Sequence, residues 1–177
     1  MTVVELARSS VERKTRWVKN FPAEGIHFAD LTPVLADAEA FNSIIKLVSQ
    51  WAEGADVVAG LDARGFLIAS GVASNNGVGV LAVRKSGKLP PPVHSVEYEL
   101  EYGTAALEIP AEGIDLADKK VFIADDVLAT GGTAKAAVDL LKQAGAEITG
   151  FATILELEEL AGRAQLSDVP VFSVATA

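Results

Sequence analysis

Cysteine is absent from this chain of 177 residues, which excludes disulfide bonds, thiolate metal sites and cysteine nucleophiles. Histidine is almost absent. His27 and His94 are the only two, neither has the spacing to a carboxylate that a metal site needs, and we predict both at the surface or in loops. Long apolar runs are missing too: the longest uncharged stretch, between Arg64 and Arg84, is interrupted by serines, asparagines and glycines. The sequence therefore indicates no membrane span and no need for an oxidising compartment.

Basic residues are scarce, with 15 Lys and Arg against 24 Asp and Glu and a formal net charge of −9. Such a surface does not bind nucleic acid or anionic lipid without specificity, so we expect neither as a partner, and an anionic ligand needs a local site. The N-terminal segment is basic, but Glu5 and Glu12 interrupt it and no apolar region follows. We therefore predict a solvated helix face rather than a targeting segment, and a cytoplasmic location.

The hydrophobic residues, which make up half of the chain, are patterned as in a single domain of the α/β class, with no repeat or long linker. Apolar residues recur at helical spacing over 2–18, 38–53, 64–75 and 132–144. Apolar, β-rich runs cover 56–61, 78–83, 121–124 and 148–154. This alternation predicts a central, mostly parallel sheet flanked by helices, with ligands at the carboxyl ends of the strands. The aromatic residues that we assign to the core are Trp17, Trp51, Phe66, Phe122 and Phe151.

Residues 85–109 depart from this alternation. Three consecutive prolines are followed by alternating residues around 97–100 and again around 104–109, which predicts an antiparallel excursion with its tip near 101–103. A long insertion beside the ligand end of a parallel sheet is typical of an active-site cover, so we interpret this segment as a lid. Basic residues precede an acidic stretch, 93–118, which holds seven acids and no base.

The segment 121–133 gives the clearest indication of a ligand-binding site. A buried strand is predicted to end in Asp125 and Asp126, and a loop of small residues then opens a helix. Backbone N–H groups of such a loop converge on one anion, and the helix N-terminus adds a positive field, as a phosphate monoester requires. The two carboxylates would accept hydrogen bonds from the hydroxyls of a ribose. The alternative is structural, with one aspartate capping the loop and the glycines only turning the chain. The loop residues concerned are Thr130, Gly131, Gly132 and Thr133.

This segment, VFIADDVLATGGT, resembles the phosphoribosyl-pyrophosphate motif of type I phosphoribosyltransferases. Further segments make the chain similar to the adenine phosphoribosyltransferase family. They are Phe21-Pro22 with Gly25-Ile26, Asp30-Leu31-Thr32-Pro33, Ala63-Arg64-Gly65-Phe66, Arg84-Lys85-x-Gly87-Lys88-Leu89-Pro90, Tyr98-x-Leu100-Glu101-Tyr102-Gly103, and Glu156-Leu157 with Gly162-Arg163. In order and spacing these segments cover almost the whole chain.

The resemblance implies a fold, a reaction and an assembly. We expect one phosphoribosyltransferase domain over 1–177, with a flexible lid at about 85–109 and an N-terminal helix and base-recognition hood at about 1–35. The implied enzyme is a pentosyltransferase of purine salvage, which converts adenine and phosphoribosyl pyrophosphate to AMP and pyrophosphate. Mg²⁺ is expected as a cofactor held mainly by the substrate's own oxygens, with no direct protein ligand. A homodimer is also implied, because in the family an arginine can reach the neighbouring subunit's site.

The resemblance also assigns site residues. A carboxyl in a closing lid suits proton transfer in glycosyl transfer, and the departing pyrophosphate needs preorganised cations. The implied catalytic residues are Glu101 and Tyr102. Ribose and its phosphate are assigned to Asp125, Asp126, Ala129, Thr130, Gly131, Gly132 and Thr133. Pyrophosphate is assigned to Ala63, Arg64, Arg84, Lys85 and Lys88, and the base to Gly25, Ile26 and Phe28.

Three features depart from the family's pattern: Asp62 stands where Glu is usual, Ala29 where Arg or Lys is frequent, and the three prolines at 90–92, in place of one, should stiffen the base of the lid. The sequence leaves two alternative functions open. One is a phosphoribosyltransferase for hypoxanthine, guanine or xanthine. The other is a non-catalytic regulator that senses phosphoribosyl pyrophosphate, against which the net charge of −9 argues if such a regulator binds nucleic acid.

Overall fold

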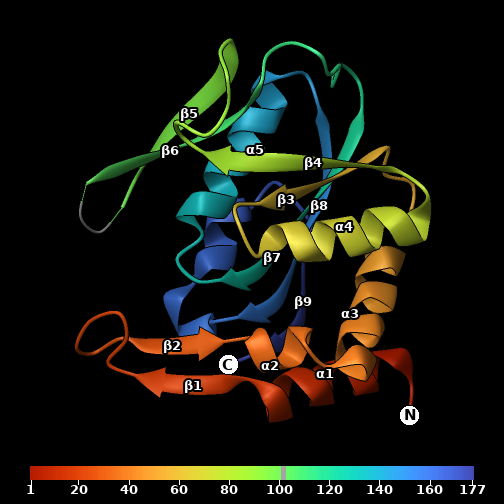
Figure 1. The fold of residues 1–177 in the computed structure, drawn as a ribbon, viewed down its shortest axis with the longest axis vertical. Coiled ribbons are helices and arrows are strands. Elements are labelled where there is room, and N and C mark those ends of the chain that lie inside the picture. Colours follow the sequence, from red (N-terminus) through yellow and green to blue (C-terminus); the bar gives the residue numbers. More distant parts are fainter. Residues whose placement is uncertain (101–102) are drawn as a thin grey trace.

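A seven-stranded sheet forms the centre of the molecule in the computed structural model, which describes residues 1–100 and 103–177 (Figure 1). The strand order is β5-β6-β4-β3-β7-β8-β9. The five strands from β4 to β9 pair in parallel, and β6 and β5 extend the sheet antiparallel at one edge. The bounds are β3 Val57–Leu61, β4 Gly79–Lys85, β5 Val93–Glu99, β6 Thr104–Pro110, β7 Lys120–Leu128, β8 Glu147–Glu156 and β9 Val171–Thr176. This confirms the predicted single α/β domain with a mostly parallel sheet.

Helices cover both faces of this sheet, and each layer has its own core. Helices α3 and α4 lie over one face, where Phe122 and Val58 are fully buried, and α5 lies over the other, against Ile123 and Phe151. Burying both faces explains why the strands read as continuous apolar runs. The helix bounds are α1 Val3–Lys14, α2 Thr32–Leu35, α3 Ala38–Trp51, α4 Gly65–Asn76, α5 Gly132–Gln143 and the short 3₁₀ helices η1 Glu158–Leu160 and η2 Gly162–Leu166.

The N-terminal segment contradicts the predicted helix over 2–18. Helix α1 ends at Lys14, and the chain continues as β1 Arg16–Lys19, which pairs antiparallel with β2 His27–Asp30. Trp17 lies on this small two-stranded sheet with 47% of its surface exposed, so its assignment to the core was wrong. The helical apolar period runs on past Thr15, but cross-strand pairing with β2 replaces it. Figure 1 shows the pair at one end of the molecule, beneath the main sheet.

Other aromatic predictions have mixed outcomes. Phe122 and Phe151 are fully buried, as predicted. Trp51 is partly buried and stacks on Phe172, with ring centroids 5.2 Å apart. Phe66 is only partly buried, because its ring lies beneath a guanidinium group at the edge of the site instead of inside the core. No helix in the two described stretches of chain is long and apolar enough to cross a membrane.

Strand β7 is longer than the predicted 121–124. It continues through Asp125 and Asp126 to Leu128, because β8 pairs with it along that length. The two aspartates therefore stand within the strand, beyond the last residue that pairs with β3, Ala124. Strand β9 at the sheet edge was not predicted. The expected antiparallel excursion is present as β5 and β6, which pair from Val93 with Pro110 to Glu99 with Thr104.

Candidate functional site

The loop between β7 and α5, residues 129–131, is shaped to receive an anion, and we call it the phosphate loop. Gly131 has φ +86° and ψ −2°, a left-handed conformation that side chains disfavour. Helix α5 begins at the next residue, and its first bond runs from the Lys135 N–H to the Gly131 carbonyl at 2.9 Å. The first N–H groups of α5 have no partner within the helix and point out of its N-terminus. Thr130 is exposed, so the loop opens to solvent.

The two aspartates of β7 differ in their surroundings. Asp126 is 4% exposed, and its Oδ2 lies 2.7 Å from Arg64 Nε, in an ion pair whose geometry is not that of a hydrogen bond. Asp125 accepts a 2.9 Å hydrogen bond from the Asp126 N–H. Burial, and then the negative charge of Asp126, raise the pKa of the Asp125 carboxyl well above its usual range. A ligand that donates hydrogen bonds here would relieve an unfavourable charge.

Arg64 joins the aspartates to an aromatic group. It is the residue just before α4, and its guanidinium lies over the ring of Phe28, 5.5 Å from the centroid. Phe28 belongs to β2, and its ring meets that of Phe21 edge to face at 5.2 Å. The structure therefore brings Phe28, Arg64 and Asp126 together from three separate parts of the chain.

A basic cluster lies at the ends of β3 and β4. The Asp62 carboxylate, 5% exposed, accepts hydrogen bonds from Arg84 Nε at 3.1 Å, from Lys88 Nζ at 3.2 Å and from the Lys85 N–H at 3.2 Å. Burial alone would raise the pKa of Asp62, but the bonds from Arg84, Lys85 and Lys88 outweigh it and lower that pKa. The Arg84 guanidinium also lies 5.7 Å from the centroid of the Phe66 ring. Asp62 thus holds two of the predicted cations in place.

Glu108 is a residue of this cluster that sequence reasoning missed. It is 8% exposed in β6, opposite Arg84, and its carboxylate accepts bonds from Ser86 Oγ at 2.7 Å and the Gly87 N–H at 3.1 Å. Glu108 therefore fixes the turn that leads to Lys88. The only signal for it was one acid inside an apolar strand, and its partner is apparent only once β4 and β6 are paired.

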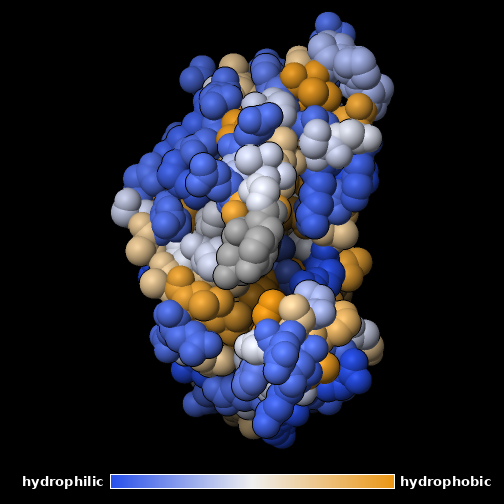
Figure 2. Space-filling view, turned by 90° about the vertical axis from the view of Figure 1, so that its left-hand side faces the viewer, coloured by the Kyte–Doolittle hydropathy of each residue, from blue (hydrophilic) through white to orange (hydrophobic). Residues whose placement is uncertain are grey.

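The β5–β6 hairpin lies against the start of α5. Thr133 Oγ1 donates to the Tyr98 hydroxyl at 3.4 Å. The Tyr98 ring and the Glu99 carbonyl both lie within 3.9 Å of where a side chain on Gly132 would begin. Figure 2 shows hydrophobic surface between this upper part of the molecule and the β1–β2 end below.

Several residues that we predicted for the functional site lie outside the contacts described above. Glu101 and Tyr102 lie outside the described residues. Gly25 and Ile26 bond within their own loop, to Asn20 and Ala23. Ala63 and the Lys85 side chain are exposed beside the basic cluster. His27 and His94 are exposed, as predicted, and the described residues contain no group of three or more acidic or histidine side chains placed to hold a metal.

Comparison with known proteins identifies the family to which this chain and its candidate site belong. The model of the phosphoribosyl transferase domain matches residues 34–175. The chain belongs to this family. Relatives named adenine phosphoribosyltransferase resemble it over about nine tenths of their own length. That of Nocardia farcinica is 58% identical over 95% of this chain and 88% of its own, and that of Corynebacterium diphtheriae is 58% identical over 93% and 91%.

Solved phosphoribosyltransferase structures agree with these relatives. The adenine phosphoribosyltransferase of Thermoanaerobacter pseudethanolicus has a TM-score of 0.89 at 40% identity, covering 99% of this chain and 100% of its own. That of Saccharomyces cerevisiae, complexed with an imino-altritol bisphosphate and adenine, has a TM-score of 0.89 at 36% identity, covering 96% and 98%. The resemblance inferred from the sequence motifs is confirmed.

Proposed function

We propose that the protein is an adenine phosphoribosyltransferase, a pentosyltransferase of purine salvage that forms AMP and pyrophosphate from adenine and phosphoribosyl pyrophosphate. The observation that carries this proposal is the convergence of an anion-binding loop, two carboxylates and a set of cations at the carboxyl ends of β3, β4 and β7. Each part suits one portion of the donor. Relatives at 58% identity that are named adenine phosphoribosyltransferase support the choice of adenine.

The donor would be bound along this edge of the sheet. Its 5-phosphate occupies the N-terminus of α5, where backbone N–H groups and hydroxyls point outward. Its ribose hydroxyls donate to Asp125 and Asp126. Its pyrophosphate would meet the cations, which would stabilise the charge that develops on the pyrophosphate oxygen as its bond to the ribose C1 breaks. The proposed phosphate and ribose residues are Asp125, Asp126, Ala129, Thr130, Gly131, Gly132 and Thr133, and the pyrophosphate residues are Ala63, Arg64, Arg84, Lys85 and Lys88.

Adenine would lie beside Phe28, whose ring is partly buried and borders the Arg64 and Asp126 pair. Aromatic and apolar walls with a few polar edge groups suit a purine. Gly25 and Ile26 would contribute backbone groups from the β1–β2 loop. This placement sets the base next to the ribose carbon that it attacks.

Proton transfer to or from the purine is assigned to Glu101, with Tyr102 as a lid contact, on the sequence alone. We expect Glu101→Gln to lower kcat far more than donor affinity, because the amide keeps the shape of the side chain and loses its proton-transfer capacity. Single-turnover kinetics together with donor titration separate the two effects. An equal loss in both would contradict the assignment.

We expect Mg²⁺ to bind together with the phosphoribosyl pyrophosphate, because the site would offer it oxygen ligands. Carboxylate oxygens and phosphate oxygens are the ligands that Mg²⁺ prefers, and the ion is usually held by one or two carboxylates plus substrate phosphates. Here the donor's own oxygens would be the main ligands, and Asp125 and Asp126 would be left to accept hydrogen bonds from the ribose hydroxyls. When bound with the donor, the ion would neutralise pyrophosphate charge, while Arg84 and Lys88 orient the leaving group.

A homodimer is proposed because one face of α4 and β4 carries apolar side chains in water. Leu67 of α4 and Val80 of β4 are each 53% exposed, and Ala82 of β4 is exposed as well. Covering them with a second copy would also bring the basic ends of β3 and β4 near the partner. Analytical ultracentrifugation tests this: Leu67→Lys should shift a wild-type dimer to monomer, and a monomeric wild type would refute the proposed dimer.

We propose the cytoplasm as the location of the protein.

The function itself is tested by offering each purine with phosphoribosyl pyrophosphate and Mg²⁺. We expect nucleotide formation with adenine and at most traces with hypoxanthine, guanine or xanthine. Turnover of another purine but not adenine would replace the proposal by the first alternative. Donor binding with no consumption of any base would favour a ligand sensor.

A further inference from the structure

The turn that begins η2 lies directly against the phosphate loop. A Cβ atom on Gly162 would overlap the Ala129 carbonyl oxygen and would come within 3.0 Å of the Gly131 nitrogen. A Cβ on Gly131 would in turn overlap the Gly162 carbonyl oxygen. The two segments therefore meet backbone to backbone, with no side chain between them. A movement of Gly162 would therefore displace the phosphate loop.

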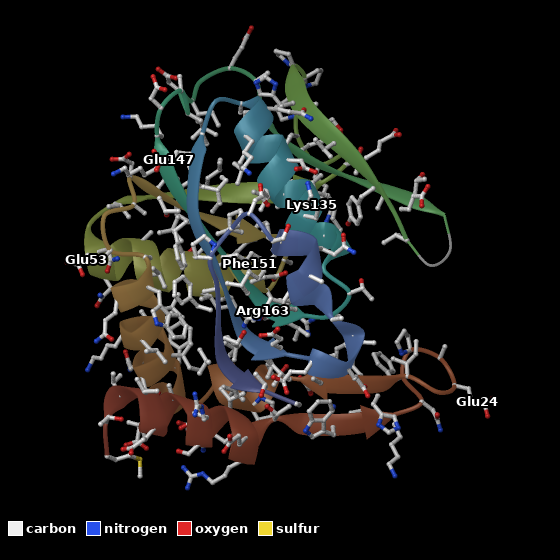
Figure 3. All side chains as sticks on the ribbon, turned by 180° about the vertical axis from the view of Figure 1, so that it is seen from behind. Glu24, Glu53, Lys135, Glu147, Phe151 and Arg163 are labelled. Carbon is white, nitrogen blue, oxygen red and sulfur yellow. The ribbon has the colours of Figure 1, made fainter. Side chains whose placement is uncertain are left out.

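The next residue, Arg163, fixes this turn to the ends of two strands (Figure 3). Its Nε and Nη2 donate to the two carboxylate oxygens of Glu156, at 2.9 and 2.5 Å. Its Nη1 donates to the Val171 carbonyl at 2.7 Å, and Nη2 also donates to Ser173 Oγ at 3.1 Å. The Ser173 hydroxyl donates to Glu156 as well. One guanidinium thus ties η2 to both β8 and β9.

Glu156 is buried, at 5% exposure, at the end of β8. The hydrogen bonds from Arg163 lower the pKa of this carboxyl and outweigh the opposing effect of burial. Glu156 is therefore charged at neutral pH and holds Arg163 in a planar, two-bonded arrangement that a lysine does not reproduce. We call Glu156, Arg163 and Ser173 the Arg163 clamp.

We propose that the Arg163 clamp is a positioning device for the donor's 5-phosphate. It touches no substrate, and it acts by holding Gly162 against the phosphate loop so that the loop's N–H groups converge before the phosphate arrives. Preorganisation of this kind raises affinity, because the loop is already ordered in the free protein and the entropy cost of ordering it does not reduce the binding free energy. The inference rests on the proposed function and deepens it, since it predicts an effect on the phosphate end of the donor and none on the base.

Two variants test the clamp, each with a matched control. Gly162→Ala introduces only a methyl group, at a residue without a positive φ, so its effect comes from the contact with Ala129. Its control is Gly79→Ala, where the nearest atom is 4.0 Å away, in Val57. Arg163→Lys keeps the charge beside Glu156 and removes the paired bond. Its control is Arg8→Lys, since Arg8 also donates to a β9 carbonyl, that of Val174, without contacting the loop.

Calorimetric titration with ribose 5-phosphate and steady-state kinetics give the readout. We expect both clamp variants to weaken ribose 5-phosphate binding and raise the donor KM by about 10-fold or more, which is about 1.4 kcal/mol. The KM for adenine at saturating donor should stay within about 2-fold, and both controls should match the wild type. Arg163→Lys decides the matter if Gly162→Ala does not fold.

A merely structural role would lower the fraction of active protein, and hence kcat, with the ribose 5-phosphate affinity of the folded fraction unchanged. That result would overturn the inference. A wild-type protein that binds ribose 5-phosphate but makes no AMP would contradict the proposed function instead. The titrations of the variants would still test whether the Arg163 clamp affects ribose 5-phosphate affinity.

Discussion

The contact between β3 and α4 is close enough that a single methyl group should disturb the site. A Cβ on Gly60 would lie 2.7 Å from the Gly65 carbonyl oxygen and 2.8 Å from the Ala69 Cβ. Carbon atoms in van der Waals contact are best separated by about 3.5–4.0 Å, so Gly60→Ala requires α4 to move away by about 0.7–1.2 Å. Gly60 has no positive φ, so the backbone itself accepts alanine and only the packing resists it.

The expected cost follows from overpacking a well-packed interior, which is about 1–3 kcal/mol. For a chain of this size that corresponds to a fall in Tm of about 2–12 °C. Function should suffer too, because α4 begins directly after Arg64, whose Nε lies 2.7 Å from Asp126. A shift of about 1 Å in a positioning group costs on the order of 100-fold in rate when the geometry is critical. We expect the donor KM to rise by about 10-fold.

Thermal unfolding followed by circular dichroism, together with donor saturation kinetics, measures both effects. Gly79→Ala in the adjacent strand is the control, because its new methyl group meets only Val57 at 4.0 Å. The control should be as stable as the wild type or slightly more stable. A Gly60→Ala variant with a Tm within about 1 °C of the wild type, where a cost of 1 kcal/mol already gives 2–4 °C, would refute the close approach.

Three further predictions rest on side-chain contacts. The pKa of Glu156 is lowered in the folded state, so its charge stabilises the protein above the ordinary glutamate pKa of about 4.3 and that contribution is lost as the pH falls. In urea unfolding, the advantage of wild type over Glu156→Gln should therefore be full at pH 7 and shrink below about pH 4. The pKa of Asp125 is raised, so its ionisation destabilises the fold as the pH rises. Asp125→Asn should exceed the wild type in Tm at pH 7 but not at pH 3, while its donor KM increases. Tyr98→Phe removes the hydroxyl that Thr133 contacts at 3.4 Å, a loss of at most about 1 kcal/mol, and should speed proteolysis of the β5–β6 hairpin; unchanged cleavage would contradict that contact.

Sequence patterns predicted best where the structure is decided locally. The strand, small-residue loop and helix of residues 121–143 follow from an apolar run, a glycine pair and helical spacing, and the structure forms all three. The helix over 2–18 failed because Arg16–Lys19 pairs with His27–Asp30, a contact that the helical period does not encode. The ends of β7 were missed for the same reason, since β8 extends it beyond Ala124.

The site was predictable as a set of charges but not as a set of contacts. The sequence indicated Arg64, Arg84 and Lys88 as cations, and the structure places Arg84 and Lys88 on one carboxylate, that of Asp62. Glu108 was missed because its partners lie about twenty residues away and meet it only across the β4–β6 pairing. Long-range pairing of this kind leaves no periodic trace in a single sequence.

Two buried acids inside the basic cluster raise the question of how a negative chain attracts an anionic donor. Asp62 and Glu108 reduce the positive charge of the cluster, yet they hold Arg84 and the turn before Lys88 in one arrangement. Ordering a long basic side chain costs about 0.5–1.5 kcal/mol when it happens on binding, and here part of that cost is met in folding. The net charge of −9 opposes the donor only at long range, where salt screens charges beyond about 8 Å. On the proposed assignment, affinity for the pyrophosphate would be set by the preorganised cations at contact distance, and the rest of the surface would be free to remain acidic.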